Sequence, residues 1–196
     1  MKTTTQRKFI AAFQVSLDGY VAGPEGEQDW VRSWSAALGL IDDVDLFVLG
    51  VGMYPPYGDY WKTIHEDNAT SVPFQNGPPD AAEIAYANKA AVTRHVVLST
   101  KANEVNWPRA EIVRSIDELR TIKAEQGKNT YVVGGMKTLA SLFEAGLIDE
   151  LVLLVHPLVL GGGRALFGDV TNQPKLSLIG AESKNAGHAV LRYRVR

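Results

Sequence analysis

The sequence predicts an α/β fold with a mixed, mostly parallel central sheet, helices on both faces and an antiparallel hairpin at the C-terminus. Two observations lead to this prediction. Residues 130–155 follow the order strand, Gly-Gly turn, helix, strand, which suits a right-handed parallel crossover. Residues 175–183 and 189–194 then form two strand-like runs joined by a short turn at 184–187 that contains a glycine. The 196 residues, 45% of them hydrophobic, are enough for one domain spanning residues 1–196.

Composition excludes several classes of function. The net charge is −2 and the basic residues are scattered, so no nucleic-acid-binding surface is predicted. The chain has no cysteine, which excludes disulfides, thiolate catalysis and cysteine-ligated metals, and no other metal site is predicted. No signal peptide or membrane-spanning run is present in the sequence, so we expect a soluble cytoplasmic protein without a membrane partner.

The N-terminal half begins with a buried strand over 9–15, which is apolar except for one polar residue. The loop over 16–30 is rich in glycine, and a helix is predicted on the apolar spacing from Trp30 to Ile41. A second buried strand covers 45–50 and ends in Gly50 and Gly52. The following run over 51–61 is dense in Gly, Pro and aromatic residues, which fits either a ligand-binding turn or a surface loop stapled by aromatic packing.

Beyond this turn, residues 65–79 are polar and proline-rich, which predicts a surface excursion. A helix is then expected over 80–91 and a strand over 94–98. A weak strand over 111–114 precedes Ser115 and Glu118, which resemble a capping box for a helix that runs to Lys123.

Three strand ends, at Gly50, Ser99 and Gly134, carry the features of a binding edge. Gly134 and Gly135 lie between a strand and the start of a helix, where bare backbone and free N–H groups favour an anion such as phosphate. A tight turn that requires small residues is the alternative, since a strict G-x-G-x-x-G pattern is absent. Ser99, Thr100 and Lys101 end another strand and fit either a phosphate site or an ordinary polar exit. Ligands bind at the carboxyl edge of such sheets.

These segments resemble the dihydrofolate reductase superfamily. The closer similarity is to the reductase domain at the C-terminus of the bifunctional riboflavin-biosynthesis deaminase-reductase, and it spans nearly the whole chain. It rests on SLDGYVAG at 16–23, LGVGMYPPYGDYW at 49–61, VVLST at 96–100 and the long run at 131–167. The resemblance implies a dihydrofolate-reductase-like three-layer fold and a reductase that takes NADPH, with NADH as the alternative, and acts on a pteridine- or pyrimidine-like compound. It also implies a homodimer and a cis peptide between Gly134 and Gly135.

The resemblance carries site roles to individual positions. It places Val15, Val21 and Ala22 near the nicotinamide of the cofactor. The strand-end turns would contact its phosphates through Gly50, Gly52, Met53, Ser99, Thr100 and Lys101. The helix start would hold its pyrophosphate through Gly134, Gly135, Met136, Lys137 and Thr138. The resemblance places Asp18, the candidate proton donor, beside the substrate with five further residues: Trp30, Tyr54, His156, Gly161 and Gly162.

The sequence also departs from the family pattern. Val51 stands where an arginine that pairs with phosphate is common, which predicts a weaker preference for NADPH over NADH. No acidic residue clearly matches the pterin-binding one of dihydrofolate reductase, so folate is not the expected substrate. The zinc-binding deaminase half has no counterpart, so deamination is not expected. A nucleotide- or flavin-binding protein that kept the fold without the chemistry is the alternative function.

Overall fold

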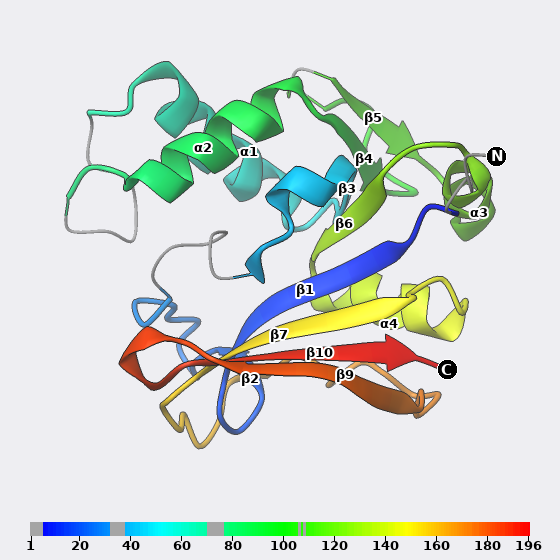
Figure 1. Cartoon of the computed structure of the whole chain (residues 1–196). Coiled ribbons are helices and arrows are strands. Elements are labelled where there is room, and N and C mark those ends of the chain that lie inside the picture. The colour runs from blue at the N-terminus through cyan, green and yellow to red at the C-terminus, as the bar shows by residue number, and fades with distance from the viewer. Residues whose placement is uncertain (1–5, 32–37, 70–76, 106, 108) are drawn as a thin grey trace, which may run out of the picture.

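The chain folds around one eight-stranded sheet, seen in a computed structural model that describes residues 6–31, 38–69, 77–105, 107 and 109–196 (Figure 1). The strand order is β5-β4-β3-β6-β1-β7-β10-β9. The strands of this sheet are β1 (Phe9–Ser16), β3 (Val44–Gly50), β4 (Arg94–Leu98), β5 (Ala110–Val113), β6 (Asn129–Gly134), β7 (Glu150–His156), β9 (Leu176–Ser183) and β10 (Ala189–Val195).

Pairing is parallel from β5 across to β7 and antiparallel for the last two strands. The predicted mixed sheet with a C-terminal hairpin is therefore confirmed. A separate two-stranded ribbon joins β2 (Tyr20–Ala22) to β8 (Arg164–Ala165), which brings the loop after β1 next to the loop after β7.

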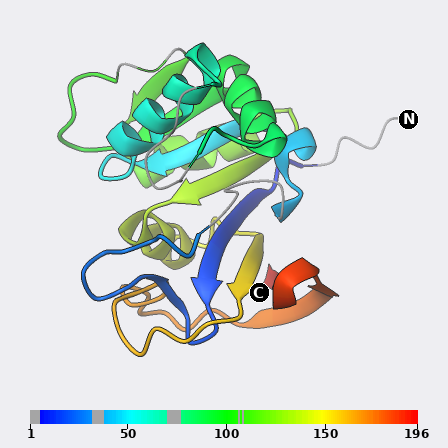
Figure 2. The ribbon, with the colours of Figure 1, turned by 90° about the vertical axis from the view of Figure 1, so that its left-hand side faces the viewer.

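Helices cover both faces of the sheet, as the hydrophobic pattern predicted. One apolar cluster contains α1 (Tyr54–Glu66), α2 (Ala81–Val92) and one set of strand residues. The second cluster contains α3 (Ile116–Ala124), α4 (Met136–Glu144) and the alternate strand residues. Along β1, for example, Ala12 belongs to the first cluster and Phe13 to the second, because successive side chains of a strand point to opposite faces. Figure 2 shows α1 and α2 lying together on their side of the sheet.

Helix α1 corrects the sequence prediction, which left residues 51–61 as an irregular turn and began a surface excursion at His65. The helix begins at Tyr54 and contains Pro55 and Pro56 in its first turn. Proline is tolerated there because those N–H groups have no partner inside the helix. Tyr57, Trp61 and Ile64 then recur at helical spacing and are buried, so the aromatic residues of this run form core packing.

The other predicted elements agree with the structure to within a few residues. Helix α2 starts with a capping box between Asp80 and Glu83, and Ser115 caps α3 by accepting the backbone N–H of Glu118 at 3.2 Å. The helix predicted from Trp30 to Ile41 lies largely outside the described residues. None of the described helices is long and apolar enough to cross a membrane.

Candidate cofactor and substrate site

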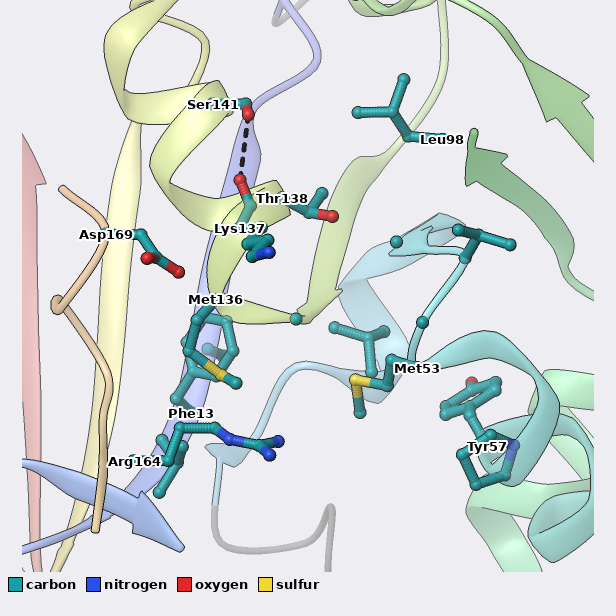
Figure 3. A pocket seen from close by; sticks show the side chains of 18 of the residues that line it. Phe13, Met53, Tyr57, Leu98, Met136, Lys137, Thr138, Ser141, Arg164 and Asp169 are labelled. Carbon is teal, nitrogen blue, oxygen red and sulfur yellow. Dashed lines mark hydrogen bonds between the residues drawn. The ribbon is translucent and has the colours of Figure 1, made fainter. Parts of the chain in front are cut away.

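A cavity of about 1220 Å³ opens at the carboxyl edge of the parallel strands. Its walls come from the ends of β1, β3, β4 and β6, from the first turns of α1 and α4, and from the loop that follows β8. In Figure 3, Met53 and Tyr57 face Met136 and Arg164 across this space. Segments far apart in the sequence therefore meet at the edge that the sequence predicted for binding.

Most of the residues predicted to contact a cofactor line this cavity. They are Val21, Gly50, Gly52, Met53, Ser99, Thr100, Lys101, Gly135, Met136, Lys137 and Thr138. The remaining predicted cofactor residues, Val15, Ala22 and Gly134, are buried beside the cavity and do not line it. The structure thus brings together three strand ends that are separated by more than thirty residues from one another in the chain.

Gly134 and Gly135 differ in how much space surrounds the position of a β-carbon. The peptide between the two residues is cis, which confirms the expectation from the family resemblance. A β-carbon on Gly134 would lie 2.8 Å from Sδ of Met53 and 3.3 Å from Cε1 of Phe13, so this position has no room for a side chain. A β-carbon on Gly135 would meet no atom within 4 Å. Since Gly135 lines the cavity, its backbone is open to a ligand.

Helix α4 presents its N-terminus to the same space. Gly135 occupies the N-cap position without a side-chain cap, and the first intrahelical bond runs from Leu139 N–H to the Gly135 carbonyl at 2.9 Å. The preceding N–H groups of a helix lack intrahelical partners and carry partial positive charge. Lys137 is exposed in this first turn and adds a full positive charge, so the α4 end of the cavity suits an anionic group.

The turn after β4 supplies a second polar corner. Oγ of the buried Ser99 accepts the backbone N–H groups of Lys101 at 3.2 Å and Ala102 at 2.9 Å, which fixes the course of the turn. Thr100 and Lys101 are exposed at the cavity rim. The Ser99 hydroxyl therefore holds the turn in place, and the two neighbours offer a hydroxyl and an ammonium group.

Asp18, the predicted proton donor, does not line the cavity and instead joins two loops. Its carboxylate accepts hydrogen bonds from Oγ of Ser16 at 2.6 Å, from Leu160 N–H at 3.2 Å and from Gly161 N–H at 2.8 Å. The Ser16 hydroxyl and the two backbone N–H groups lower the pKa of Asp18 to about 2. The carboxylate is therefore ionised at neutral pH, and this geometry favours a structural role as a clip between the loops.

The predicted substrate residues also lie outside the cavity lining. Tyr54 and His156 are buried, and Gly161 and Gly162 belong to the loop held by Asp18. Trp30 packs edge-on against His156, with ring centroids 4.9 Å apart. His156 in turn hydrogen bonds to Gln14, and Gln14 does line the cavity. Trp30 and His156 therefore lie behind Gln14 of the cavity wall.

Sequence reasoning missed several polar residues that the structure places in the cavity wall. Gln14 is the one polar residue inside the apolar strand 9–15, and a polar side chain within a buried strand indicates a specific hydrogen-bond partner or ligand. Arg164 extends its guanidinium group into the cavity, and Asp169 lies beside the first turn of α4 (Figure 3). Tyr57 also lines the cavity, where burial raises the pKa of its phenol and keeps it neutral. Among the described residues, no group of three or more potential metal ligands gathers at any point.

The family model described as the RibD C-terminal domain matches residues 7–190. The chain belongs to the RibD C-terminal domain family. Family membership agrees with the fold, because the match runs from β1 to the start of β10 and includes every segment that forms the cavity. The RibD C-terminal domain family is reductase-like, so the chain is a reductase-like protein.

A sequence relative and two solved structures extend the comparison. The uncharacterized protein YyaP of Bacillus subtilis is 27% identical over 186 residues, which cover 93% of this chain and 92% of YyaP. The crystal structure of a putative riboflavin biosynthesis protein from Shewanella sp. PV-4 has a TM-score of 0.66 at 21% identity and covers 96% of this chain and 99% of that chain. The dihydrofolate reductase of Enterococcus faecalis, complexed with NADP(H), has a TM-score of 0.63 at 14% identity, with 97% and 98% covered. The two structural likenesses show that this RibD C-terminal domain has the dihydrofolate-reductase-like fold.

Proposed function

We propose that this RibD C-terminal domain protein is an NADPH-dependent oxidoreductase that reduces a C=N or C=O bond in a small pteridine- or pyrimidine-like compound. Such a reaction is related to that of the 5-amino-6-(5-phosphoribosylamino)uracil reductase of riboflavin biosynthesis. The cofactor, when bound, supplies the hydride, while the protein orients both reactants and excludes water. The observation that carries the proposal is the cavity itself, which joins an anion-binding end to an apolar end across the carboxyl edge of the sheet.

The residues at the anion-binding end fit a dinucleotide. Gly135 and Gly52 leave open backbone, since a β-carbon on either would meet no atom within 4 Å. The uncapped N-terminus of α4 and the Lys137 side chain suit a pyrophosphate. Thr100 and Lys101 suit a further phosphate on the adenosine, which is the group that distinguishes NADPH from NADH.

The apolar end suits the nicotinamide ring and the substrate. Phe13, Val21 and Met136 provide apolar wall, and Gln14 and Tyr57 provide isolated polar groups. A few polar groups in a mostly apolar pocket fix the orientation of a planar heterocycle. Arg164 adds a positive charge at this end, which suits a substrate with an acidic group.

One observation favours a second function, that of a nucleotide- or flavin-binding protein without catalysis. Val51 lines the cavity with 39% of its surface exposed, at the position where the family commonly has arginine. Its side chain cannot pair with a phosphate, so this turn holds a nicotinamide cofactor less firmly than in relatives.

A thermal-shift comparison with NADPH, NADH, FMN and no ligand distinguishes the two functions. A ligand that binds the folded protein adds about 2.7 kcal/mol of stability at about one hundred times its dissociation constant. We expect a rise in the unfolding temperature with NADPH. A rise with FMN alone would support the second function, and no rise with either nicotinamide cofactor would refute the first.

A further inference from the structure

A row of hydrogen-bonded side chains runs from the surface of the protein to the cavity wall. His188 contacts the Asn185 carbonyl oxygen through Nδ1 at 2.9 Å and His156 Nδ1 through Nε2 at 3.1 Å. His156 contacts Gln14 Oε1 through its own Nε2 at 2.9 Å. His188 is half-buried, His156 is 3% exposed, and Gln14 lines the cavity. Protonation at the outer end of the row can therefore affect the group at the inner end.

The number of ring protons in this row follows from its partners. The Asn185 carbonyl oxygen only accepts, so His188 Nδ1 must carry a proton. Gln14 Oε1 also only accepts, so His156 Nε2 must carry one as well. The contact between the two rings needs a third proton. Two neutral imidazoles hold one proton each, so the row carries one positive charge when the Gln14 oxygen faces His156.

The third proton lies in the contact between His188 Nε2 and His156 Nδ1, and burial disfavours a charge on the inner ring. Burial, and then the charge of His188, lower the pKa of His156 to about 4. His188 Nε2–H therefore donates to His156 Nδ1, and the inner ring remains neutral. The groups that face the inner ring are Gln14 of β1, the Trp30 ring and His188 itself. Within the described ranges neither histidine forms an ion pair, and Arg192 of β10 donates to the Leu38 carbonyl.

Loss of the extra proton changes what the row requires of Gln14. His188 keeps its Nδ1 proton for Asn185, so its Nε2 becomes an acceptor and His156 Nδ1 must donate to it. His156 Nε2 is then unprotonated and needs a donor. Gln14 can supply one by rotating its amide by half a turn, which exchanges Oε1 and Nε2 and keeps every contact hydrogen-bonded.

We propose that Gln14 is a specificity-determining residue, and that protonation of the His156–His188 pair selects whether Gln14 offers an N–H donor or an oxygen acceptor to the cavity. With the pair charged, the amide turns its N–H groups away from His156 and suits a ligand carbonyl. With the pair neutral, the amide oxygen takes that place and suits a ligand amine. The identity of the ligand rests on the proposed function, whereas the switch is a property of the free protein.

Nuclear magnetic resonance of the free, 15N-labelled protein tests the switch. The side-chain amide signal of Gln14 is assigned by its loss in Gln14→Leu, and the ring nitrogens of both histidines are followed from about pH 5 to about pH 8, where histidine ordinarily titrates. We expect His156 Nε2 to change from a protonated to an unprotonated ring nitrogen as the pair loses its extra proton. The Gln14 amide protons should shift with the same midpoint. A His156 Nε2 that stays protonated throughout, or a Gln14 signal that does not move, would overturn the proposal.

Two variants separate the switch from general effects of pH. His188→Asn removes the outer ring, so the pH dependence of the Gln14 signal should disappear. His65→Asn is the matched control, because His65 is exposed on α1 and pairs with Asn88 at 2.8 Å, apart from this row. It should leave the Gln14 titration unchanged. A Gln14 titration that survives in His188→Asn would contradict the proposed role of the pair.

Specificity is measured with uracil and cytosine, whose edges carry a carbonyl acceptor and an amine donor at the same ring position. The ratio of their dissociation constants should favour uracil at about pH 5 and move toward cytosine by about pH 8. A change of about threefold to tenfold corresponds to one neutral hydrogen bond. The change should be absent in Gln14→Leu, and a ratio independent of pH in the wild-type protein would count against the role in specificity. These measurements contain no cofactor. Failure of NADPH to bind would therefore refute the proposed function but would not change the outcome of this test.

Discussion

A β-carbon placed on Gly50 would lie 2.1 Å from Oγ1 of Thr138. A side chain on Gly50 would therefore require the Thr138 hydroxyl, in the first turn of α4, to move. Thr138 is buried at this contact, with 8% of its surface exposed. The close approach brings the two strand-end turns of the candidate phosphate site into one wall.

Gly50→Ala should destabilise the protein by about 1–3 kcal/mol, which is the usual cost of forcing an extra methyl group into a packed position. Thr138→Ala combined with Gly50→Ala should recover part of the loss, because the closest atom is gone. Urea unfolding of the four members of this double-mutant cycle gives the coupling between the two positions. Additive effects would show that the two residues do not share the space that we describe.

Gly135→Val should abolish the stabilisation by NADPH while the protein stays folded. The new side chain has room in the free protein, since a β-carbon there meets no atom within 4 Å, and it would project into the cavity. Gly180→Val is the matched control, because a β-carbon on Gly180 makes only ordinary contact with Arg192 at 3.7 Å, away from the cavity. Thermal shifts with NADPH measure both variants. Normal NADPH binding by Gly135→Val would mean that the cofactor does not approach α4.

Val51→Arg should tighten NADPH binding more than NADH binding. A charge-assisted bond to phosphate contributes about 1.5–3 kcal/mol, or roughly one to two powers of ten in affinity. The gain should decrease at high salt, because the position is exposed. Val92→Arg places the same charge on an exposed site at the end of α2, outside this cavity, and controls for the change in net charge. Titration calorimetry measures the affinities of both cofactors for the variant and the wild type. Equal affinities in Val51→Arg and the wild type would show that this turn does not contact the cofactor.

Asp18→Asn should lower the stability of the protein at neutral pH. The hydrogen bonds from Ser16 and the 160–161 backbone hold the pKa of Asp18 at about 2, below its model-peptide value of 3.8. The ionised carboxylate therefore stabilises the fold above about pH 4, and this contribution is lost as the pH falls toward about 2. The difference in urea midpoint between Asp18→Asn and the wild type should shrink over that range. Asp59→Asn, at an exposed position on α1, should show no such trend.

We propose that the protein is a homodimer that forms through β9, the edge strand of the sheet. Leu176, Leu178 and Ile179 expose 41%, 57% and 45% of their surfaces on this strand. An apolar edge strand left in water invites pairing with another chain. Light scattering should give twice the 21.4 kDa mass of one chain, and Leu178→Lys should reduce the measured mass to that of a single chain. Val92→Lys, on an exposed site of α2, should leave the mass unchanged, and a monomeric wild type would contradict the proposal.

The order of strands and helices could be predicted because apolar runs and turn residues mark them directly. Gly134 and Gly135 marked the helix start, and Ser99 to Lys101 marked a strand end, so this wall of the cavity was predictable at residue level. Helix α1 was not predicted, because Pro55, Pro56 and Gly58 hid its apolar spacing. Three polar residues elsewhere in the cavity wall were not predicted either. Gln14, Arg164 and Asp169 reach the cavity through strand register and the β2–β8 ribbon, which local sequence patterns do not encode.

Strand β1 lies in the middle of the sheet, and its neighbouring residues Phe13 and Gln14 serve opposite faces. Phe13 packs with the layer of α3 and α4 beside Gly134, whereas Gln14 belongs to the row of histidines on the other side. Both line the same cavity. Two neighbouring residues of one strand therefore reach the cavity from opposite layers of the fold, so position 14 can be changed without altering the layer that Phe13 packs against.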